Sequence, residues 1–221
     1  MPEKIYTIPI NEAFDKKCGC PICSIYEMLE KNEIDAILGA SMMEPDIRVA
    51  TNRLGFCPDH FEKLLRAGKK LPLALMLESH VIELCDNMKK SPEAQAKAFS
   101  AVSESCYLCT RIENYIENIY LNLFWLFAED EAFREKVKGQ KCYCLPHYAK
   151  LLTLAKTRLK RQDYKKFTEY LTATEERYLS SLSKDITDFT KMFDYRNADA
   201  EWGDFKDAPE RIIKTLNSEL G

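Results

Sequence analysis

Apolar side chains recur along this chain at intervals of three and four residues, the spacing that places them on one face of an α-helix. Over 178–193 they fall at Tyr178, Leu182, Ile186, Phe189 and Phe193. A wider stripe, rich in aromatic residues, runs through 107–128. The pattern predicts helices at about 23–38, 58–68, 72–90, 92–104, 107–128, 130–138, 146–160, 162–195 and 209–218, after a short N-terminal arm over 1–17. We therefore expect an all-α protein.

Two local signals refine this prediction. Ser91 followed by Pro92 is typical of a helix start, with a capping side chain and then a proline whose missing N–H costs little. The stripe over 107–128 is expected to pack into the core, because stripes at helical spacing are more often core than ligand pocket. Only 7 glycines are present in the whole chain, which also favours helices over a turn-rich β fold.

Cysteine and histidine form a doubled pattern. The first half of the chain carries C-x2-C at Cys20 and Cys23 and C-x2-H at Cys57 and His60, and the second half carries C-x2-C at Cys106 and Cys109 and C-x2-H at Cys144 and His147. The spacers, 24–56 and 110–143, have nearly equal length, and corresponding residues lie 86 or 87 positions apart. The pattern C-x-x-H-aromatic-x-K-L-L also follows both histidines.

Such internal repetition indicates duplication of one helical unit. We expect a first repeat over 1–91 and a second over 92–221, with the long C-terminal helices in the second; the two repeats could also form one compact domain.

Three cysteines and one histidine form a ligand set for zinc, which takes four ligands tetrahedrally. The sequence thus predicts two Zn²⁺ ions per chain, each in a Cys3His site carried by one repeat. Crosswise pairing between the repeats would satisfy the same chemistry, and the spacing does not decide between the two arrangements.

Some residues stand outside this pattern. Cys18, Cys85 and Cys142 belong to none of the four half-sites, and Cys18 and Cys142 each lie two residues before a ligand cysteine. They could therefore compete as ligands, whereas buried free cysteines are often inert. His80 lies on an apolar helical stretch and is expected to be an ordinary core or surface histidine.

Charge and composition indicate which binding partners and which cellular compartment to expect. The formal net charge is −3, which gives no general electrostatic reason for binding nucleic acid or anionic membranes. Six basic residues lie within 156–166, and we expect them to form a solvated helix face. The N-terminal segment lacks the pattern of a secretory signal, so nine cysteines fit metal ligation in the cytoplasm better than a disulfide scaffold.

The C-P-x-C at 20–23, the G-F-C-x-x-H at 55–60 and their echo at 106–147 resemble a bacterial family, common among Gram-positive anaerobes, known only as a domain of unknown function. The resemblance covers nearly the whole chain and implies no reaction. In the second C-x2-C, Tyr107 and Leu108 replace the proline pattern of the first.

Three functional classes remain open. We favour a non-enzymatic helical module with two structural zinc sites that serves interaction with a protein partner or regulation. The first alternative is a thiol-based redox or metal sensor, because C-x-x-C thiols can have depressed pKa values. The second alternative is an iron–sulfur protein, which a Cys3His set disfavours because such clusters usually take four cysteines.

Overall fold

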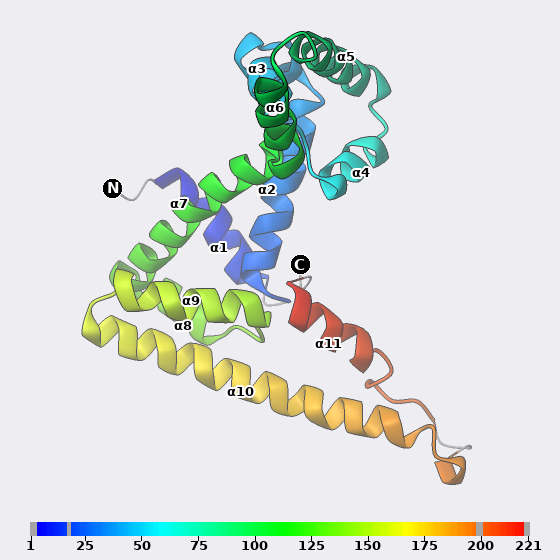
Figure 1. Ribbon diagram of the computed structural model, residues 1–221. Coiled ribbons are helices and arrows are strands. Elements are labelled where there is room, and N and C mark those ends of the chain that lie inside the picture. Colours follow the sequence, from blue (N-terminus) through cyan, green and yellow to red (C-terminus); the bar gives the residue numbers. More distant parts are fainter. Residues whose placement is uncertain (1–3, 17–18, 198–200, 219–221) are drawn as a thin grey trace. The chain divides into compact units, whose positions relative to one another are not determined.

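The computed structural model describes residues 4–16, 19–197 and 201–218, and every regular element within them is a helix (Figure 1). The predicted all-α fold is confirmed. The helices are α1 (Thr7–Asp15), α2 (Pro21–Ile37), α3 (Pro45–Leu54), α4 (Pro58–Arg66), α5 (Lys70–Asn87), α6 (Pro92–Glu104), α7 (Tyr107–Glu129), α8 (Glu131–Lys138), α9 (Leu145–Arg158), α10 (Arg161–Lys191) and α11 (Ala208–Asn217). Short 3-10 helices occupy Lys4–Tyr6, Ala40–Met43 and Tyr195–Asn197.

The nine predicted helices correspond to α2 and to α4 through α11. At α6 the Ser91 hydroxyl accepts a hydrogen bond from the backbone N–H of Ala94 and Pro92 follows in the first turn, so the predicted helix start is confirmed.

Two helices were not predicted. The expected N-terminal arm forms α1, where Ile10 and Phe14 are buried one turn apart and Pro9 lies in the first turn, which tolerates it. The ends of that arm, 1–3 and 17, lie outside the described residues. The second helix, α3, begins at Pro45 in a polar stretch where Thr51 is the buried residue, so its apolar periodicity is weak.

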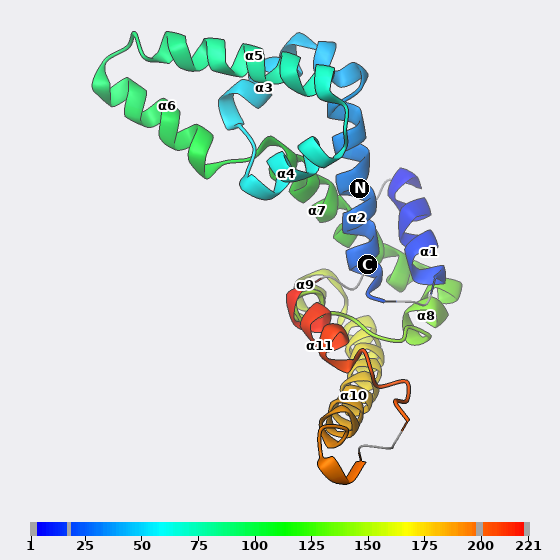
Figure 2. The same ribbon diagram turned by 90° about the vertical axis from the view of Figure 1, so that its right-hand side faces the viewer.

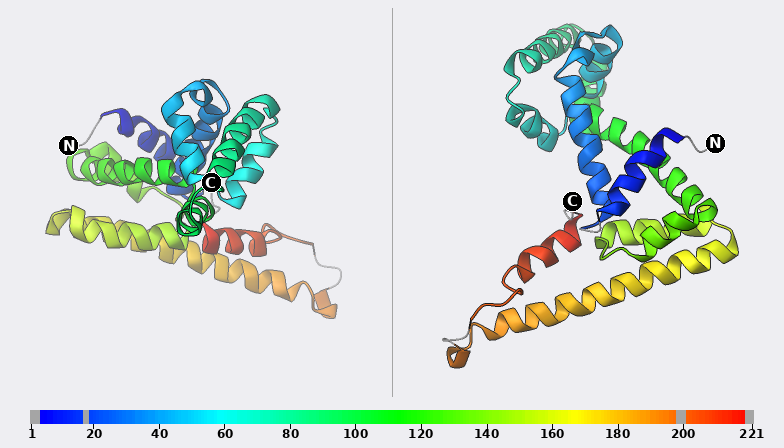
Figure 3. Two further views of the ribbon diagram at one scale, coloured as in Figure 1. Left: turned by 45° about the horizontal axis from the view of Figure 1, so that its top comes forward. Right: turned by 180° about the vertical axis from the view of Figure 1, so that it is seen from behind.

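The described chain divides into two compact units. One unit comprises 1–27 and 117–221, and in it α10 packs along α8, α9 and α11 (Figure 3). Aromatic rings fill its core: Phe127 meets Phe167 with ring centroids 4.9 Å apart, and Phe14 meets Phe133 at 5.1 Å. The stripe predicted on 107–128 is therefore a core stripe, with Ile119, Leu123 and Phe127 fully buried.

The other unit comprises 28–116, and in it α3 packs against α5 and α6, which form a helical hairpin (Figure 2). Its core gathers apolar residues of α4 and α5, such as Leu64 and Met76, around Phe56 and Leu108.

The limits of the two units fall inside α2 and α7. The predicted repeat boundary at 91–92 lies between α5 and α6, within the 28–116 unit, and the duplication itself stays a prediction. No described helix combines the length and the apolar character that a membrane span requires.

Candidate metal centres

Each of the four half-sites lies at the start of a helix. The first ligand residue directly precedes the helix and the second is the third residue within it, at α2 (Cys20, Cys23), α4 (Cys57, His60), α7 (Cys106, Cys109) and α9 (Cys144, His147). In all four, the carbonyl of the first ligand residue accepts a hydrogen bond from the backbone N–H four positions on, at 2.9–3.2 Å. This first turn brings both side chains of a half-site to one side of the helix end.

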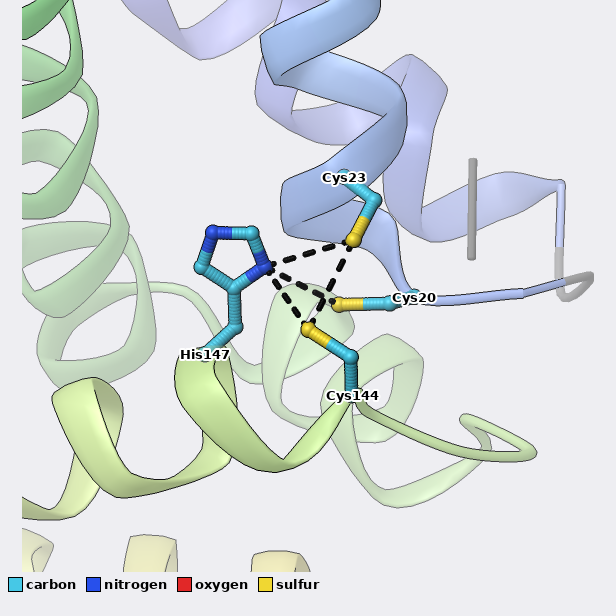
Figure 4. Close-up of side chains that lie close together, drawn as sticks. All are labelled: Cys20, Cys23, Cys144 and His147. Atoms are coloured by element: carbon cyan, nitrogen blue, oxygen red, sulfur yellow. Dashed lines mark hydrogen bonds between the residues drawn. The ribbon is translucent and has the colours of Figure 1, made fainter. Parts of the chain in front are cut away.

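The group that we call the Cys20 site joins α2 to α9 within the first unit. It comprises Cys20, Cys23, Cys144 and His147. The three sulfurs lie 3.7, 3.3 and 3.0 Å, in that order, from His147 Nδ1, and the Sγ atoms of Cys23 and Cys144 are 3.6 Å apart (Figure 4). The three cysteines are buried and His147 is partly exposed.

The second group, which we call the Cys57 site, joins α4 to α7 within the 28–116 unit. It comprises Cys57, His60, Cys106 and Cys109. His60 Nδ1 lies 3.2 Å from the sulfurs of Cys57 and Cys106 and 3.4 Å from that of Cys109, and the Sγ atoms of Cys57 and Cys109 are 3.9 Å apart. Cys57 and Cys109 are only partly buried, so this group is more accessible than the Cys20 site.

The structure thus pairs the half-sites crosswise, and the in-order grouping of one complete set per repeat is not observed. The C-x2-H of the first half closes with the C-x2-C of the second, and the reverse holds for the Cys20 site. At the Cys57 site, this pairing follows from the way the segment before Cys57 is held in place. The Gly55 carbonyl accepts a hydrogen bond from the Tyr107 N–H at 2.9 Å, and the Leu54 carbonyl accepts one from the Ser105 hydroxyl at 2.8 Å, which holds this segment against the start of α7.

Gly55 makes this contact sterically feasible. It has φ +61° and ψ −159°, a backbone region essentially restricted to glycine. A Cβ atom at this position would lie 2.9 Å from the carbonyl oxygen of Val102. No side chain can therefore replace the hydrogen atom of Gly55 without moving α6 or the segment that leads to Cys57.

The ends of two helices give each group a positive electrostatic environment. The partial positive charge at a helix N-terminus favours thiolates, and each group lies at two such ends. Burial opposes ionisation of Cys106, but contacts with His60 and with backbone N–H groups outweigh it and lower the pKa of this thiol to about 6. Burial and the neighbouring Cys106 raise the pKa of Cys109 to about 12.

The same division occurs at the Cys20 site. Contacts with Cys20 and Cys23 lower the pKa of Cys144, whereas burial raises the pKa of Cys20 well above its ordinary value. One thiol in each group therefore ionises readily while a neighbour resists a second negative charge. A cation at the centre would remove that conflict, because it stabilises all three thiolates together.

A carboxylate lies behind the histidine of the Cys57 site. Glu30 Oε1, on α2, is 3.2 Å from His60 Nε2, the ring nitrogen that points away from the sulfurs. Lys63, one turn after His60 on α4, donates to both oxygens of Glu30 at 2.6 Å. Carboxylates in this position orient a ligating histidine and raise its basicity.

The Cys20 site has different neighbours. The ring of Tyr26 stacks on His147, with centroids 5.4 Å apart. Glu175 is 3% exposed, and its Oε2 accepts a hydrogen bond from the N–H of Tyr143, the residue before Cys144, at 3.2 Å. Ser218, at the end of α11, approaches two of the three sulfurs. Sequence reasoning missed Glu30, Glu175 and Ser218, because no local spacing relates them to the ligand residues.

The structure brings all eight predicted ligand residues into the two groups. Cys85 is exposed and lies in neither; Cys142 is buried and is also in neither; Cys18 lies outside the described residues. His80 is likewise in neither group. The basic residues of 156–166 are exposed, as expected for a solvated helix face.

Fold and site together define an all-α protein with two Cys3His groups, each of which could hold a metal ion. The whole chain, residues 1–221, matches the family described as a family of unknown function (DUF6062), and the protein belongs to that family. The resemblance drawn from the cysteine and histidine motifs is confirmed. Neither the curated proteins nor the solved structures gave a significant match.

Proposed function

We propose that this protein binds two zinc ions, one in the Cys20 site and one in the Cys57 site, and that both ions are structural. The observation that carries the proposal is the geometry of the ligand atoms: within each group the three sulfurs and the histidine nitrogen all lie within 4.8 Å of one another.

The individual distances support zinc. With Zn–S near 2.3 Å and Zn–N near 2.0–2.1 Å, a tetrahedron has S···S edges of about 3.8 Å and S···N edges of about 3.6 Å. The S···S distances of 3.6 and 3.9 Å bracket the first value. The S···N distances run from 3.0 to 3.7 Å, so the longest matches the second value and the shortest falls below it. A disulfide would instead require about 2.05 Å between sulfurs, so the groups are not oxidised cysteine pairs.

A complete set of four protein ligands is the mark of a structural zinc site, since a catalytic zinc keeps a position open for water or substrate. Each ion would tie together two helix N-termini that are far apart in the sequence, and its binding free energy would contribute to folding. We therefore infer a non-enzymatic helical module for protein interaction or regulation. We place it in the cytoplasm, where thiolates remain reduced.

Elemental mass spectrometry of the untagged protein, purified anaerobically, tests the proposal. We expect about two zinc ions per chain for the wild type, and about one after Cys20→Ser or after Cys57→Ser, because each substitution removes one ligand of one group. Cys85→Ser is the matched control, since Cys85 is exposed and outside both groups. A folded wild-type protein without metal would overturn the proposal. Detection of iron with acid-labile sulfide would also contradict it and would indicate an iron–sulfur cluster in place of zinc.

A further inference from the structure

The end of the C-terminal helix reaches the Cys20 site. Ser218, the residue that follows α11, places its Oγ 3.4 Å from Cys144 Sγ and its carbonyl oxygen 3.3 Å from Cys23 Sγ. It therefore touches one sulfur from each of the two half-sites that the group joins. These contacts link positions 74 and 195 residues apart along the chain.

The backbone of Ser218 is unusual for its residue type. It adopts φ 64° and ψ 37°, the left-handed conformation, and among the described residues other than glycine it has the only positive φ. Helices commonly end in this conformation, but glycine usually occupies the position because it has no Cβ atom to clash. Serine has a Cβ atom and is less favourable than glycine in this conformation, but it supplies a hydroxyl beside Cys144.

The hydroxyl is the part of Ser218 that suits a metal-bound group. Sulfur that ligates a cation is a thiolate, which accepts hydrogen bonds and donates none. The Ser218 Oγ–H can donate to the thiolate of Cys144, and hydrogen bonds to charged acceptors are the stronger ones. The Ser218 carbonyl accepts from the Cys23 thiol, so that hydrogen bond is lost when Cys23 becomes a thiolate, and the hydroxyl is the group of Ser218 that can favour the metal-bound state.

The rest of α11 holds this residue in place. Thr215 is 2% exposed, and its hydroxyl lies 3.2 Å from that of Tyr178 on α10. Arg211 donates to Asp185 of α10 at 2.9 Å. The Ser218 hydroxyl therefore stands on a helix that is already packed against the body of its unit, which lowers the entropic cost of presenting it to Cys144.

We propose that Ser218 is a positioning residue of the Cys20 site, whose hydroxyl donates to the Cys144 thiolate and so couples retention of the metal to the docking of α11. This inference rests on the proposed metal binding. The C-terminal helix would thus control the metal of the Cys20 site and not that of the Cys57 site. Any partner or cleavage that displaces the end of α11 would release metal from the Cys20 site first.

The test compares Ser218→Ala and Ser218→Gly with the wild type in the full-length protein loaded with zinc. A chelator is added, and alkylation of each cysteine is followed by peptide mass spectrometry, so both groups are read in one sample. Loss of a hydrogen-bonding neighbour typically weakens metal binding by about 10- to 100-fold. We expect Cys20, Cys23 and Cys144 to react correspondingly faster in both variants, while the three thiols of the Cys57 site keep the wild-type rate.

Three features separate this role from a merely structural one. Glycine suits the left-handed helix end better than serine, so a residue that only terminates α11 would give a Ser218→Gly variant that holds its metal as well as the wild type. In protein loaded with cobalt instead of zinc, loss of the hydrogen bond should shift the thiolate-to-cobalt charge-transfer band to lower energy in both variants. Asn217→Ala, at the exposed preceding position, is the matched control and should change neither readout.

The two failures are distinguishable. A wild-type chain that binds no metal would overturn the proposed function. A chain that binds two ions, with unchanged alkylation rates and an unchanged cobalt spectrum after both substitutions at Ser218, would overturn this inference alone.

Discussion

Replacement of Glu30 tests whether the Cys57 site depends on more than its four ligands. Glu30 lies 3.2 Å from His60 Nε2 and also pairs with Lys63. Glu30→Gln keeps the size of the side chain and removes its charge, so the histidine loses its anionic partner while the packing on α2 is retained. Lys63 is left without its carboxylate, but its side chain is 47% exposed and water can solvate it.

The expected effect follows from the role of such carboxylates. Their removal typically weakens metal binding by about 10- to 100-fold, which corresponds to roughly 1.4–2.7 kcal/mol. We expect the lower part of this range, because the Glu30 side chain is 25% exposed and solvent partly screens its charge. The loss should be confined to the Cys57 site.

The assay is competition with a chelator of known affinity, read separately at the two sites by the alkylation rates of their cysteines. Glu33→Gln is the matched control: Glu33 also lies on α2, but its carboxylate pairs with Arg111 rather than with a ligand residue. If Glu30→Gln left the Cys57 site unchanged, or weakened both sites equally, the assignment of Glu30 as the partner of His60 would be refuted.

Four further outcomes are expected. Cys57→Ser should expose the two remaining thiols of the Cys57 site to alkylation and leave the Cys20 site protected; reactivity of the Cys20 site instead would contradict the crosswise pairing. Gly55→Ala should lower the free energy of unfolding in urea by about 1–3 kcal/mol or more, because of its glycine-only backbone and the approach to Val102. Gly68→Ala, where φ is +73° but no atom lies within 4 Å of the added Cβ, should cost less, and equal losses would argue against the contact. Chelation of the metal should weaken or abolish the cooperative thermal transition seen by circular dichroism, and an unchanged transition would mean that the ions do not stabilise the fold. Burial lowers the pKa of His80 from 6.5, so its contribution to stability is complete above pH 6.5 and is lost as the pH falls below that value; His80→Gln should therefore show a smaller acid-dependent loss than the wild type, and parallel curves would exclude this role.

Much of the fold could be predicted because its helices have local signals. The aromatic stripe that became the core face of α7 and the Ser91–Pro92 start of α6 are both visible in a few consecutive residues. The helix α3 was not predicted because few of its residues are buried, so the apolar periodicity that identifies a helix is weak there. The segment that forms α1 was not predicted as a helix because it is short, and all its buried residues follow Pro9.

The candidate ligands were also predictable, since two ligands three positions apart reach one centre from the first turn of a helix. The residues around them were not. Glu30 approaches His60 from a helix 30 positions earlier, and Ser218 approaches Cys144 from 74 positions later. Such contacts leave no periodic trace, because they depend on how separate helices pack rather than on spacing along one of them.

The sequence by itself determined the helical class and the eight cysteine and histidine residues, because helix periodicity and the spacing of paired ligands are properties of short segments. Only the tertiary structure decided which half-sites close together. Spacers such as 24–56 are long enough to return the chain to either partner, and the choice rests on distant contacts such as the Tyr107 N–H hydrogen bond to the Gly55 carbonyl. A ligand set can thus be predicted from local chemistry, whereas its partition between two centres depends on packing across the fold.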